Sequence, residues 1–440
     1  MIPYSEFLSR KALTHQPSGL ADDVVLSDKL KPFQGHVTRW ALQQGRAAVF
    51  ADCGLGKSWM ALEWARSVVE HTGRPVLILT PLAVAAQFIR EGQKLGVDVA
   101  SAFLGTSDRE WWCPGVWVAN YESLHKLDRL IPQLGGVVLD ESSILKNFTG
   151  KTRNALIETF KPVPYRLACT ATPSPNDPVE LGNHAEFLGV MRHVDMLNRF
   201  FEHDAGDTGS WVLKGHGRRP FWRWVSSWAM CLRKPSDIGF SDEGYDLPPL
   251  EMREHVVDVD QHMARQAGML FAFEASTLSE QREVRRASIE ERVAKAAQLT
   301  RDDEQWLVWA GLNDESTALV KAIPGAVEVT GSDTAEAKEQ RVLDFIDGRI
   351  RVLVSKVSIV GFGVNLQCCA RQAFVGADHS FEALYQAVRR SWRFGQTRPV
   401  HAHLIRTSAD GAIVENMRRK KDEFERLHRE LAEAVNGRTT

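Results

Sequence analysis

Two long stretches of this chain alternate short apolar runs with amphipathic helical patterns, and this alternation constrains the fold more than any other feature. The apolar runs cover residues 47–51, 76–80, 116–119, 137–139 and 166–170 in the first stretch, and residues 305–309, 326–330, 352–355, 372–375 and 400–405 in the second. Gly, Pro or polar residues bound these runs, which is typical of strands buried in a parallel sheet. Strands that alternate with helices pair in parallel through right-handed crossovers. The sequence therefore predicts an α/β protein with two parallel-sheet lobes.

Composition restricts the class of protein but does not identify a binding partner. A chain of 440 residues can hold about two or three domains, each with its own core. Its net charge of −2 points to no polyanionic partner, so any nucleic-acid contact must come from local basic patches. The six cysteines lack metal-binding spacing and are expected to be reduced. We find neither a signal peptide nor an apolar run of about 18 residues, and expect a cytoplasmic protein without a membrane span.

Between the two stretches the pattern changes to charged helices and a Gly-rich loop. We read residues 203–220 as a loop and residues 261–299 as mainly helical. The predicted organisation is an N-terminal extension (1–24), a first lobe (25–180), a helical insertion that completes it (181–245), a linker with a helical protrusion (246–300), a second lobe (301–412) and a C-terminal helix (413–440).

The segment AVFADCGLGKSWMAL is predicted to form a strand, a phosphate-binding loop and the start of a helix. Its Gly residues allow backbone N–H groups to wrap a phosphate, and the helix N-terminus adds its dipole. Lys57 could reach the β- and γ-phosphates, and the Ser58 hydroxyl could ligate Mg²⁺. The predicted nucleotide-binding loop comprises Cys53, Gly54, Leu55, Gly56, Lys57 and Ser58. The strict motif has Gly where this chain has Ala51, a small residue that we expect to suffice.

An acidic pair follows a second apolar strand in VVLDESS. Open α/β sheets bind ligands at the carboxyl ends of their strands, where Asp140 and Glu141 would lie. We expect Asp140 to hold Mg²⁺ together with Ser58, and Glu141 to position or deprotonate the attacking water. An Asp-Glu pair alone is usually a strand-end turn, and the preceding phosphate loop is what favours catalysis.

Three polar residues in QAVRRSWRFGQ are spaced to share one helical face. Gln386, Arg390 and Arg393 stand at i, i+4 and i+7. One amide and two guanidinium groups could clamp a phosphoryl group and neutralise charge in its transition state. The alternative is a solvated basic face on a surface helix. We expect Arg389, off that face, to form a salt bridge or contact nucleic acid.

The order of these motifs resembles superfamily 2 helicases, in particular the Swi/Snf-type branch of DNA-dependent ATPases and its compact forms in phages and mobile elements. The resemblance spans roughly residues 28–410. LKPFQGHVTRW resembles the adenine-reading segment, with Gln34 at the key position. The segments LTPLAVAAQF, VANYESL, TATPSPN, VTGS and SKVSIVGFGVNLQ resemble nucleic-acid-binding or coupling motifs and mark Thr80, Pro81, Gln87, Tyr121, Thr170, Thr172, Gly331, Ser332 and Asn365. Gly363 in the last segment could approach a phosphate.

The resemblance implies two RecA-like lobes with ATP and Mg²⁺ bound in a cleft between them. It further implies that hydrolysis is coupled to movement along DNA, which we expect to be duplex, by a monomer in a bacterial or phage-infected cell. Two alternatives are an RNA-dependent ATPase or helicase and a non-enzymatic, ATP-gated nucleic-acid-binding module. Ser142 and Ser143 stand where relatives have Ala-His, which leaves the coupling step open.

The stretch GRRPFWRWVSSWAMCLRK interleaves aromatic and basic residues and allows two interpretations. It could bind DNA through stacking and phosphate contacts. Alternatively, Phe221, Trp224, Val225 and Trp228 follow helical spacing and face a core, which we favour. Trp222 and Arg223 would then project elsewhere and remain candidates for DNA contact.

Overall fold

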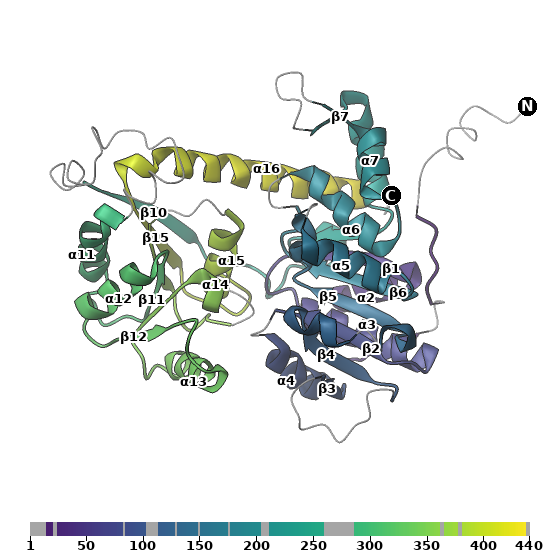
Figure 1. Ribbon diagram of the computed structural model, residues 1–440, viewed down its shortest axis with the longest axis horizontal. Coiled ribbons are helices and arrows are strands. Elements are labelled where there is room, and N and C mark those ends of the chain that lie inside the picture. Colours follow the sequence, from purple (N-terminus) through teal and green to yellow (C-terminus); the bar gives the residue numbers. More distant parts are fainter. Residues whose placement is uncertain are drawn as a thin grey trace, which may run out of the picture. The chain divides into compact units, whose positions relative to one another are not determined.

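The computed structural model describes residues 15–20, 24–81, 84–102, 113–127, 130–147, 150–174, 177–203, 211–258, 286–360, 365–376 and 381–436. The chain divides into two compact units. Unit 1 comprises Met1–Glu243 and Glu423–Thr440, and unit 2 comprises Gly244–Asp422. Each unit contains one parallel sheet with helices packed on it, so the predicted α/β fold class is confirmed (Figure 1).

The sheet of unit 1 has seven parallel strands in the order β3-β4-β2-β5-β6-β1-β9. These are β1 Arg46–Ala51, β2 Val76–Thr80, β3 Val99–Ser101, β4 Val116–Asn120, β5 Gly136–Asp140, β6 Tyr165–Thr170 and β9 Ala229–Leu232. The central strands are buried along their whole length, as expected for a sheet covered on both faces. A separate antiparallel pair is formed by β7 Phe201–His203 and β8 Trp211–Leu213.

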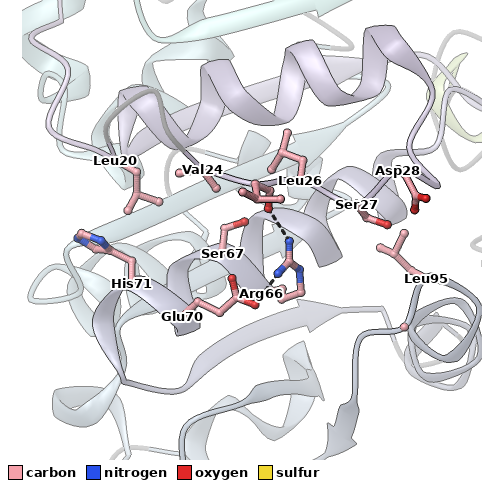
Figure 2. Close-up of a pocket in the computed structure, with 12 residues that line it drawn as sticks. Leu20, Val24, Leu26, Ser27, Asp28, Arg66, Ser67, Glu70, His71 and Leu95 are labelled. Atoms are coloured by element: carbon pink, nitrogen blue, oxygen red, sulfur yellow. Dashed lines mark hydrogen bonds and ion pairs between the residues drawn. The ribbon is translucent and has the colours of Figure 1, made fainter.

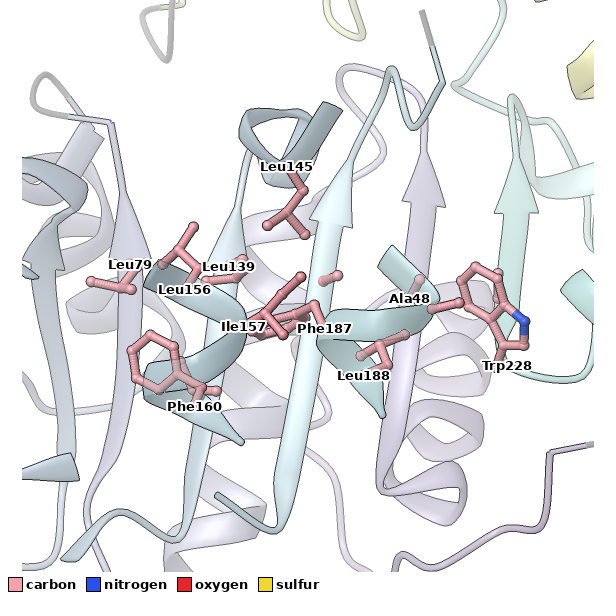
Figure 3. Packing of buried hydrophobic residues seen from close by; sticks show 14 of the residues in the cluster. Ala48, Leu79, Leu139, Leu145, Leu156, Ile157, Phe160, Phe187, Leu188 and Trp228 are labelled. Carbon is pink, nitrogen blue, oxygen red and sulfur yellow. The ribbon is translucent and has the colours of Figure 1, made fainter. Parts of the chain in front are cut away.

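Helices pack on both faces of this sheet. Helix α3 (Lys57–Thr72) packs against β2, β5 and β6, with α2 (Pro32–Gln44) and α4 (Ala85–Leu95) beside it. On the other face, α5 (Lys151–Phe160) and α6 (Leu181–Leu188) contribute Leu156, Phe160, Phe187 and Leu188 to a core that also contains Leu79, Leu139 and Ala48 of the strands (Figure 3). Burying each such large side chain contributes about 1.5–3 kcal/mol. Two further helices, α7 (His193–Phe200) and α8 (Arg218–Val225), extend this core.

The sheet of unit 2 has six parallel strands in the order β10-β15-β14-β11-β13-β12. These are β10 Leu250–Val257, β11 Trp306–Ala310, β12 Ala326–Val329, β13 Val352–Ser355, β14 Arg371–Val375 and β15 Val400–Thr407. One face packs against α11 (Ile289–Leu299) and α12 (Asn313–Ala322). The other face packs against α13 (Ala335–Ile346), α15 (Phe381–Ser391) and the first turns of α16 (Gly411–Asn436). The short helix α14 (Val357–Val360) follows β13.

All ten strands expected from the sequence are present, within a residue or two of their predicted limits. Five strands were not expected from the sequence: β3, β7, β8, β9 and β10. Strand β10 was not predicted because its residues are largely polar or exposed, as those of edge strands often are. Part of the expected loop at 203–220 is ordered as β8 and α8, and residues 259–285 of the expected helical segment lie outside the described residues.

The aromatic-basic stretch contains α8 and the whole of β9. Phe221, Trp224, Val225 and Trp228 are all buried in the core of unit 1, which confirms the packing interpretation. The prediction that Trp222 projects elsewhere is wrong, because its side chain is also buried and packs at 4.8 Å against the ring of Phe221. Within the described part of the chain, no helix has the length and apolar character needed to cross a membrane.

Candidate nucleotide site

The predicted phosphate-binding loop connects β1 to α3 in unit 1. Gly54 and Gly56 both have positive φ, at 90° and 83°, so the loop uses backbone conformations that glycine adopts readily. The Lys57 ammonium donates to the carbonyl oxygens of Ala51 at 2.8 Å and Asp52 at 3.3 Å. The lysine side chain is therefore folded back over the loop, with carbonyl partners that a phosphate could replace.

Gln34 supports this loop from α2. Its amide nitrogen donates to the Leu55 carbonyl at 2.9 Å, and its amide oxygen accepts from the Lys31 backbone N–H. A Cβ added at Gly56 would lie 2.3 Å from the Gln34 amide nitrogen. The predicted adenine-reading glutamine therefore lies directly against the phosphate loop, and the loop can approach it only because Gly56 lacks a side chain.

The acidic pair lies at the same edge of the sheet as the phosphate loop. Asp140 of β5 pairs with Cys169 of β6, and Cys169 in turn pairs with Val49 of β1. Neighbouring strands lie about 4.8 Å apart, so one intervening strand places the ends of β5 and β1 about 10 Å apart. Burial and the charge of Asp140 raise the pKa of the Cys169 thiol well above its usual range, while the charge of Lys57 acts in the opposite direction. Lys57 of the loop and both carboxylates of the acidic pair therefore act electrostatically on the Cys169 thiol.

Asp140 and Glu141 have distinct backbone surroundings. The Tyr121 hydroxyl donates to the Asp140 carbonyl at 2.7 Å, and burial followed by the nearby carboxylates raises the pKa of Tyr121 well above its ordinary value. Glu141 has a φ of 53°, and among the described residues it is the one non-glycine with positive φ. Tyr121, which the family resemblance assigns to nucleic acid, therefore uses its hydroxyl to hold the acidic strand end.

The donor set at this edge suits Mg²⁺. Ser58 lies in the first turn of α3, and Asp140 ends β5. Hydroxyl and carboxylate oxygens are the hard ligands that Mg²⁺ binds, usually one or two from protein and the rest from phosphate and water. In the part of the chain that the structure describes, no three His, Cys, Asp or Glu side chains gather into a protein-only metal cage.

The second group of predicted catalytic residues lies in unit 2. Gln386 and Arg390 are one turn apart on α15 and almost completely buried, so the alternative of a solvated basic face is wrong. The prediction that Arg393 shares their helical face is also wrong, because α15 ends at Ser391. The Gln396 amide nitrogen donates to the carbonyls of Ser391 and Gln367, which stabilises the turn that carries Arg393.

Arg389, which we expected to form a salt bridge or contact nucleic acid, packs against aromatic rings. Its side chain is buried, and its guanidinium lies 4.9 Å from the ring centre of Trp392 and 6.0 Å from that of Tyr385. Cation–π contacts of a desolvated guanidinium stabilise the fold by about 2 kcal/mol. This geometry favours a packing role for Arg389 over a contact with nucleic acid.

No protein-family model matches the chain. A curated protein of Drosophila melanogaster, the SWI/SNF-related matrix-associated actin-dependent regulator of chromatin subfamily A-like protein 1, is 22% identical over 432 residues. The match confirms the resemblance to Swi/Snf-type proteins. It covers 90% of this chain but 56% of the relative, so the chain spans little more than half of that protein's length.

Among solved structures, the Sulfolobus solfataricus SWI2/SNF2 ATPase core in complex with dsDNA is similar to this chain, with a TM-score of 0.45 and 17% sequence identity. The similarity covers 88% of this chain and 89% of the solved one.

The remaining residues of unit 1 that the family resemblance marks lie at strand ends, just beyond them, or on α4. Thr170 and Thr172 are fully buried at the end of β6 and just beyond it, where the Thr170 hydroxyl accepts from the Thr172 backbone N–H at 3.1 Å. Thr80 ends β2 and is also fully buried, with its hydroxyl donating to the carbonyl of Pro81. Gln87 on α4 donates to the Glu91 carboxylate at 2.8 Å.

In unit 2, the corresponding residues are more exposed. Gly331 and Ser332 follow β12 at the surface, where the Lys338 ammonium donates to the Gly331 carbonyl. The exposed Asn365 accepts from the backbone N–H of Gln367 at 3.3 Å. Gly363 lies outside the described residues.

An open pocket elsewhere in unit 1, of about 980 Å³, lies between α3 and a lining formed by Leu20 and residues 24–28 (Figure 2). Its cation is Arg66, whose guanidinium is bound by the carboxylates of Glu63 and Glu70 and by the Val25 carbonyl. Because these acceptors occupy the guanidinium, the pocket offers poor recognition of a phosphate. None of the predicted site residues lines it.

Proposed function

We propose that this protein is an ATPase that requires Mg²⁺ and is stimulated by duplex DNA, along which it translocates. The observation that carries the proposal is the strand order β5-β6-β1, which places Asp140 at the end of β5 and the Lys57 loop after β1 at the same edge of the first sheet. A phosphate loop with its lysine, and an acidic pair separated from it by one strand, are the components that phosphoryl transfer to water requires. A simple nucleotide-binding module would have no need of Glu141 beside Asp140.

Each residue of unit 1 then has a chemical task. The loop N–H groups and Lys57 would bind the β- and γ-phosphates, and Gln34 would contact the adenine. Ser58 and Asp140 would hold Mg²⁺, which neutralises charge that develops on the phosphate oxygens. Glu141 would accept a proton from the attacking water or orient it.

The proposal also gives Gln386, Arg390 and Arg393 of unit 2 a part in the same reaction. Two guanidinium groups near the γ-phosphate would stabilise transition-state charge, an effect typically worth about 10³–10⁵ in rate. Such residues also allow the presence of the γ-phosphate to bias a change of conformation, which hydrolysis then releases. This coupling is how turnover would drive movement along DNA.

Two observations support DNA as the stimulating polymer and a reducing compartment as the location of the protein. The curated relative is named as a chromatin regulator, which favours DNA over RNA as the polymer. None of the six cysteines, all of which lie in the described residues, forms a disulfide, and this supports a reducing compartment such as the cytoplasm. RNA-stimulated turnover is the alternative that the experiment must separate.

The deciding experiment is steady-state ATP hydrolysis by the full chain with no polymer, duplex DNA, single-stranded DNA or duplex RNA. We expect duplex DNA to give the largest stimulation, and Lys57→Ala to reduce stimulated turnover by at least about 10²-fold. Lys161→Ala is the matched control, because Lys161 is an exposed lysine of the same unit. Turnover that no nucleic acid increases would contradict the proposal, and a preference for duplex RNA would replace DNA by RNA. Displacement of the third strand of a triplex would then separate translocation from strand unwinding.

A further inference from the structure

The segment that follows Glu141 is a short 3₁₀ helix, η4 (Ser142–Lys146). Glu141 precedes it with a φ of 53°. A residue with a Cβ in this left-handed region stores about 1–2 kcal/mol of strain and persists only where its surroundings determine the conformation. The orientation of the Glu141 carboxylate therefore depends on what holds η4 in place.

Helix α6 holds η4 at both ends. The Ser142 hydroxyl lies 3.1 Å from Nε2 of His184, and the Asn183 side-chain amide donates to the Lys146 carbonyl at 3.1 Å. Ser142, Asn183 and His184 are fully buried. Between these two contacts, Leu145 of η4 packs into the core of unit 1 (Figure 3). The turn after Glu141 is thus fixed by two polar contacts and one apolar contact.

His184 also contacts the strand that leads to the phosphate loop. Its ring packs edge-on against Phe50 of β1, with 5.2 Å between the ring centres. Burial lowers the pKa of His184 to about 4, so the ring is neutral at neutral pH and has one N–H donor and one acceptor nitrogen. A neutral ring can exchange a hydrogen bond with Ser142 without placing a charge beside the catalytic carboxylates.

We propose that His184, supported by Asn183, is a positioning residue that sets the orientation of Glu141 through Ser142. The inference rests on the proposed ATPase function. In this arrangement α6, which follows the Thr170–Thr172 segment in the chain, determines where the water-activating carboxylate lies relative to β1 and its loop. Loss of the Ser142–His184 contact lets η4 shift, which misplaces Glu141 while leaving the phosphate loop intact.

The test compares His184→Leu, Ser142→Ala and the double variant in steady-state ATP hydrolysis with saturating duplex DNA. We expect each single variant to lower kcat about tenfold with KM for ATP changed less than about threefold, because the loss concerns transition-state interactions. The double variant should be no worse than the worse single variant, since both remove the same contact. His184→Gln, whose side-chain amide can replace Nε2, should retain kcat within about threefold of the wild type.

The matched control is His193→Leu. His193 is also buried, and its pKa is likewise lowered to about 4 by burial, but it lies on α7. We expect this variant to change thermal stability without changing kcat. An unchanged kcat in His184→Leu, an equal loss in His193→Leu, or additive effects in the double variant would each overturn the proposal. If the wild type itself shows no turnover with any polymer, the proposed function fails instead, so the two failures are distinguishable.

Discussion

At the scale of single residues, Gly56 joins the phosphate loop to α3 in a backbone conformation that few other residues adopt. Its φ is 83°, and the space where a Cβ would lie is occupied by the Gln34 amide at 2.3 Å. The positive φ and the absence of a Cβ have the same explanation. The loop backbone has to approach Gln34 closely while its N–H groups remain directed at a phosphate. A substitution at Gly56 therefore changes the backbone of the phosphate loop and leaves every proposed catalytic side chain in place.

We predict that Gly56→Ala raises KM for ATP and lowers the free energy of unfolding more than Gly73→Ala does. Gly73 ends the same helix with a φ of 61°, but a Cβ added there would meet nothing within 4 Å. The control therefore carries only the left-handed backbone penalty of about 1–2 kcal/mol, whereas Gly56→Ala also displaces Gln34 from the Leu55 carbonyl. Urea denaturation and ATP kinetics measure the two effects. Equal values for both variants would refute the importance of the Gln34 contact.

At the scale of the element, α15 shows that neighbouring arginines on one helix can lie in different surroundings. Arg389 and Arg390 are both almost completely buried, but they point in different directions from the helix axis. Arg389 lies over the ring of Trp392 within unit 2, whereas Arg390 lies one turn after Gln386. The helix then ends, and Arg393 is held in the turn beyond it.

We predict that Arg390→Ala and Arg393→Ala lower kcat by at least about 10²-fold with little change in KM for ATP, as expected for groups that act in the transition state. Arg389→Ala should instead lower the melting temperature and leave much of kcat intact, because it removes a packing contact. ATP kinetics and thermal unfolding of the three variants provide the measurement. An arginine whose removal spares turnover would lose its assignment to the reaction.

At the scale of the whole molecule, each unit has its own sheet and its own core, so each should respond separately to a core mutation. Unit 2 contains a fully buried ion pair in which the Arg292 guanidinium lies 2.6 Å from the Glu315 carboxylate. The same carboxylate accepts from the Gly311 backbone N–H at 2.7 Å, which ties α11 and α12 to the end of β11. Breaking a buried pair leaves an uncompensated charge and typically costs about 3–5 kcal/mol.

We therefore predict that Glu315→Gln destabilises unit 2 by a few kcal/mol, on the order of the loss of a buried ion-pair partner. Hydrogen exchange should show faster exchange in β11, β13 and β14, with β1, β5 and β6 protected as in the wild type. Asp344→Asn is the control, because Asp344 forms an ion pair with the exposed Arg349 and its loss should change little. Equal loss of protection in both sheets would show that the two units unfold as one.

Much of the fold and of the site was predictable because both depend on local patterns. Short apolar runs between helical segments identified ten of the strands, and the glycines before Lys57 identified the phosphate loop. The predictions failed where the burial of a side chain or the end of a helix depended on contacts outside the local pattern. Trp222 is buried because it packs with the core of unit 1, including Phe221, and α15 ends at Ser391, whose carbonyl accepts from the Gln396 side chain.

The sequence by itself thus determined the two parallel sheets, the phosphate loop and the strand that ends in Asp140, since each is a periodic pattern or a fixed local spacing. Only the tertiary structure decided that Cys169 separates the loop from the acidic pair, that Tyr121 supports Asp140, and that His184 contacts Ser142. The physical reason is sequence distance. His184 follows Ser142 by 42 positions, and only the packing of α6 against η4 brings a buried imidazole within hydrogen-bonding distance of the turn that orients Glu141.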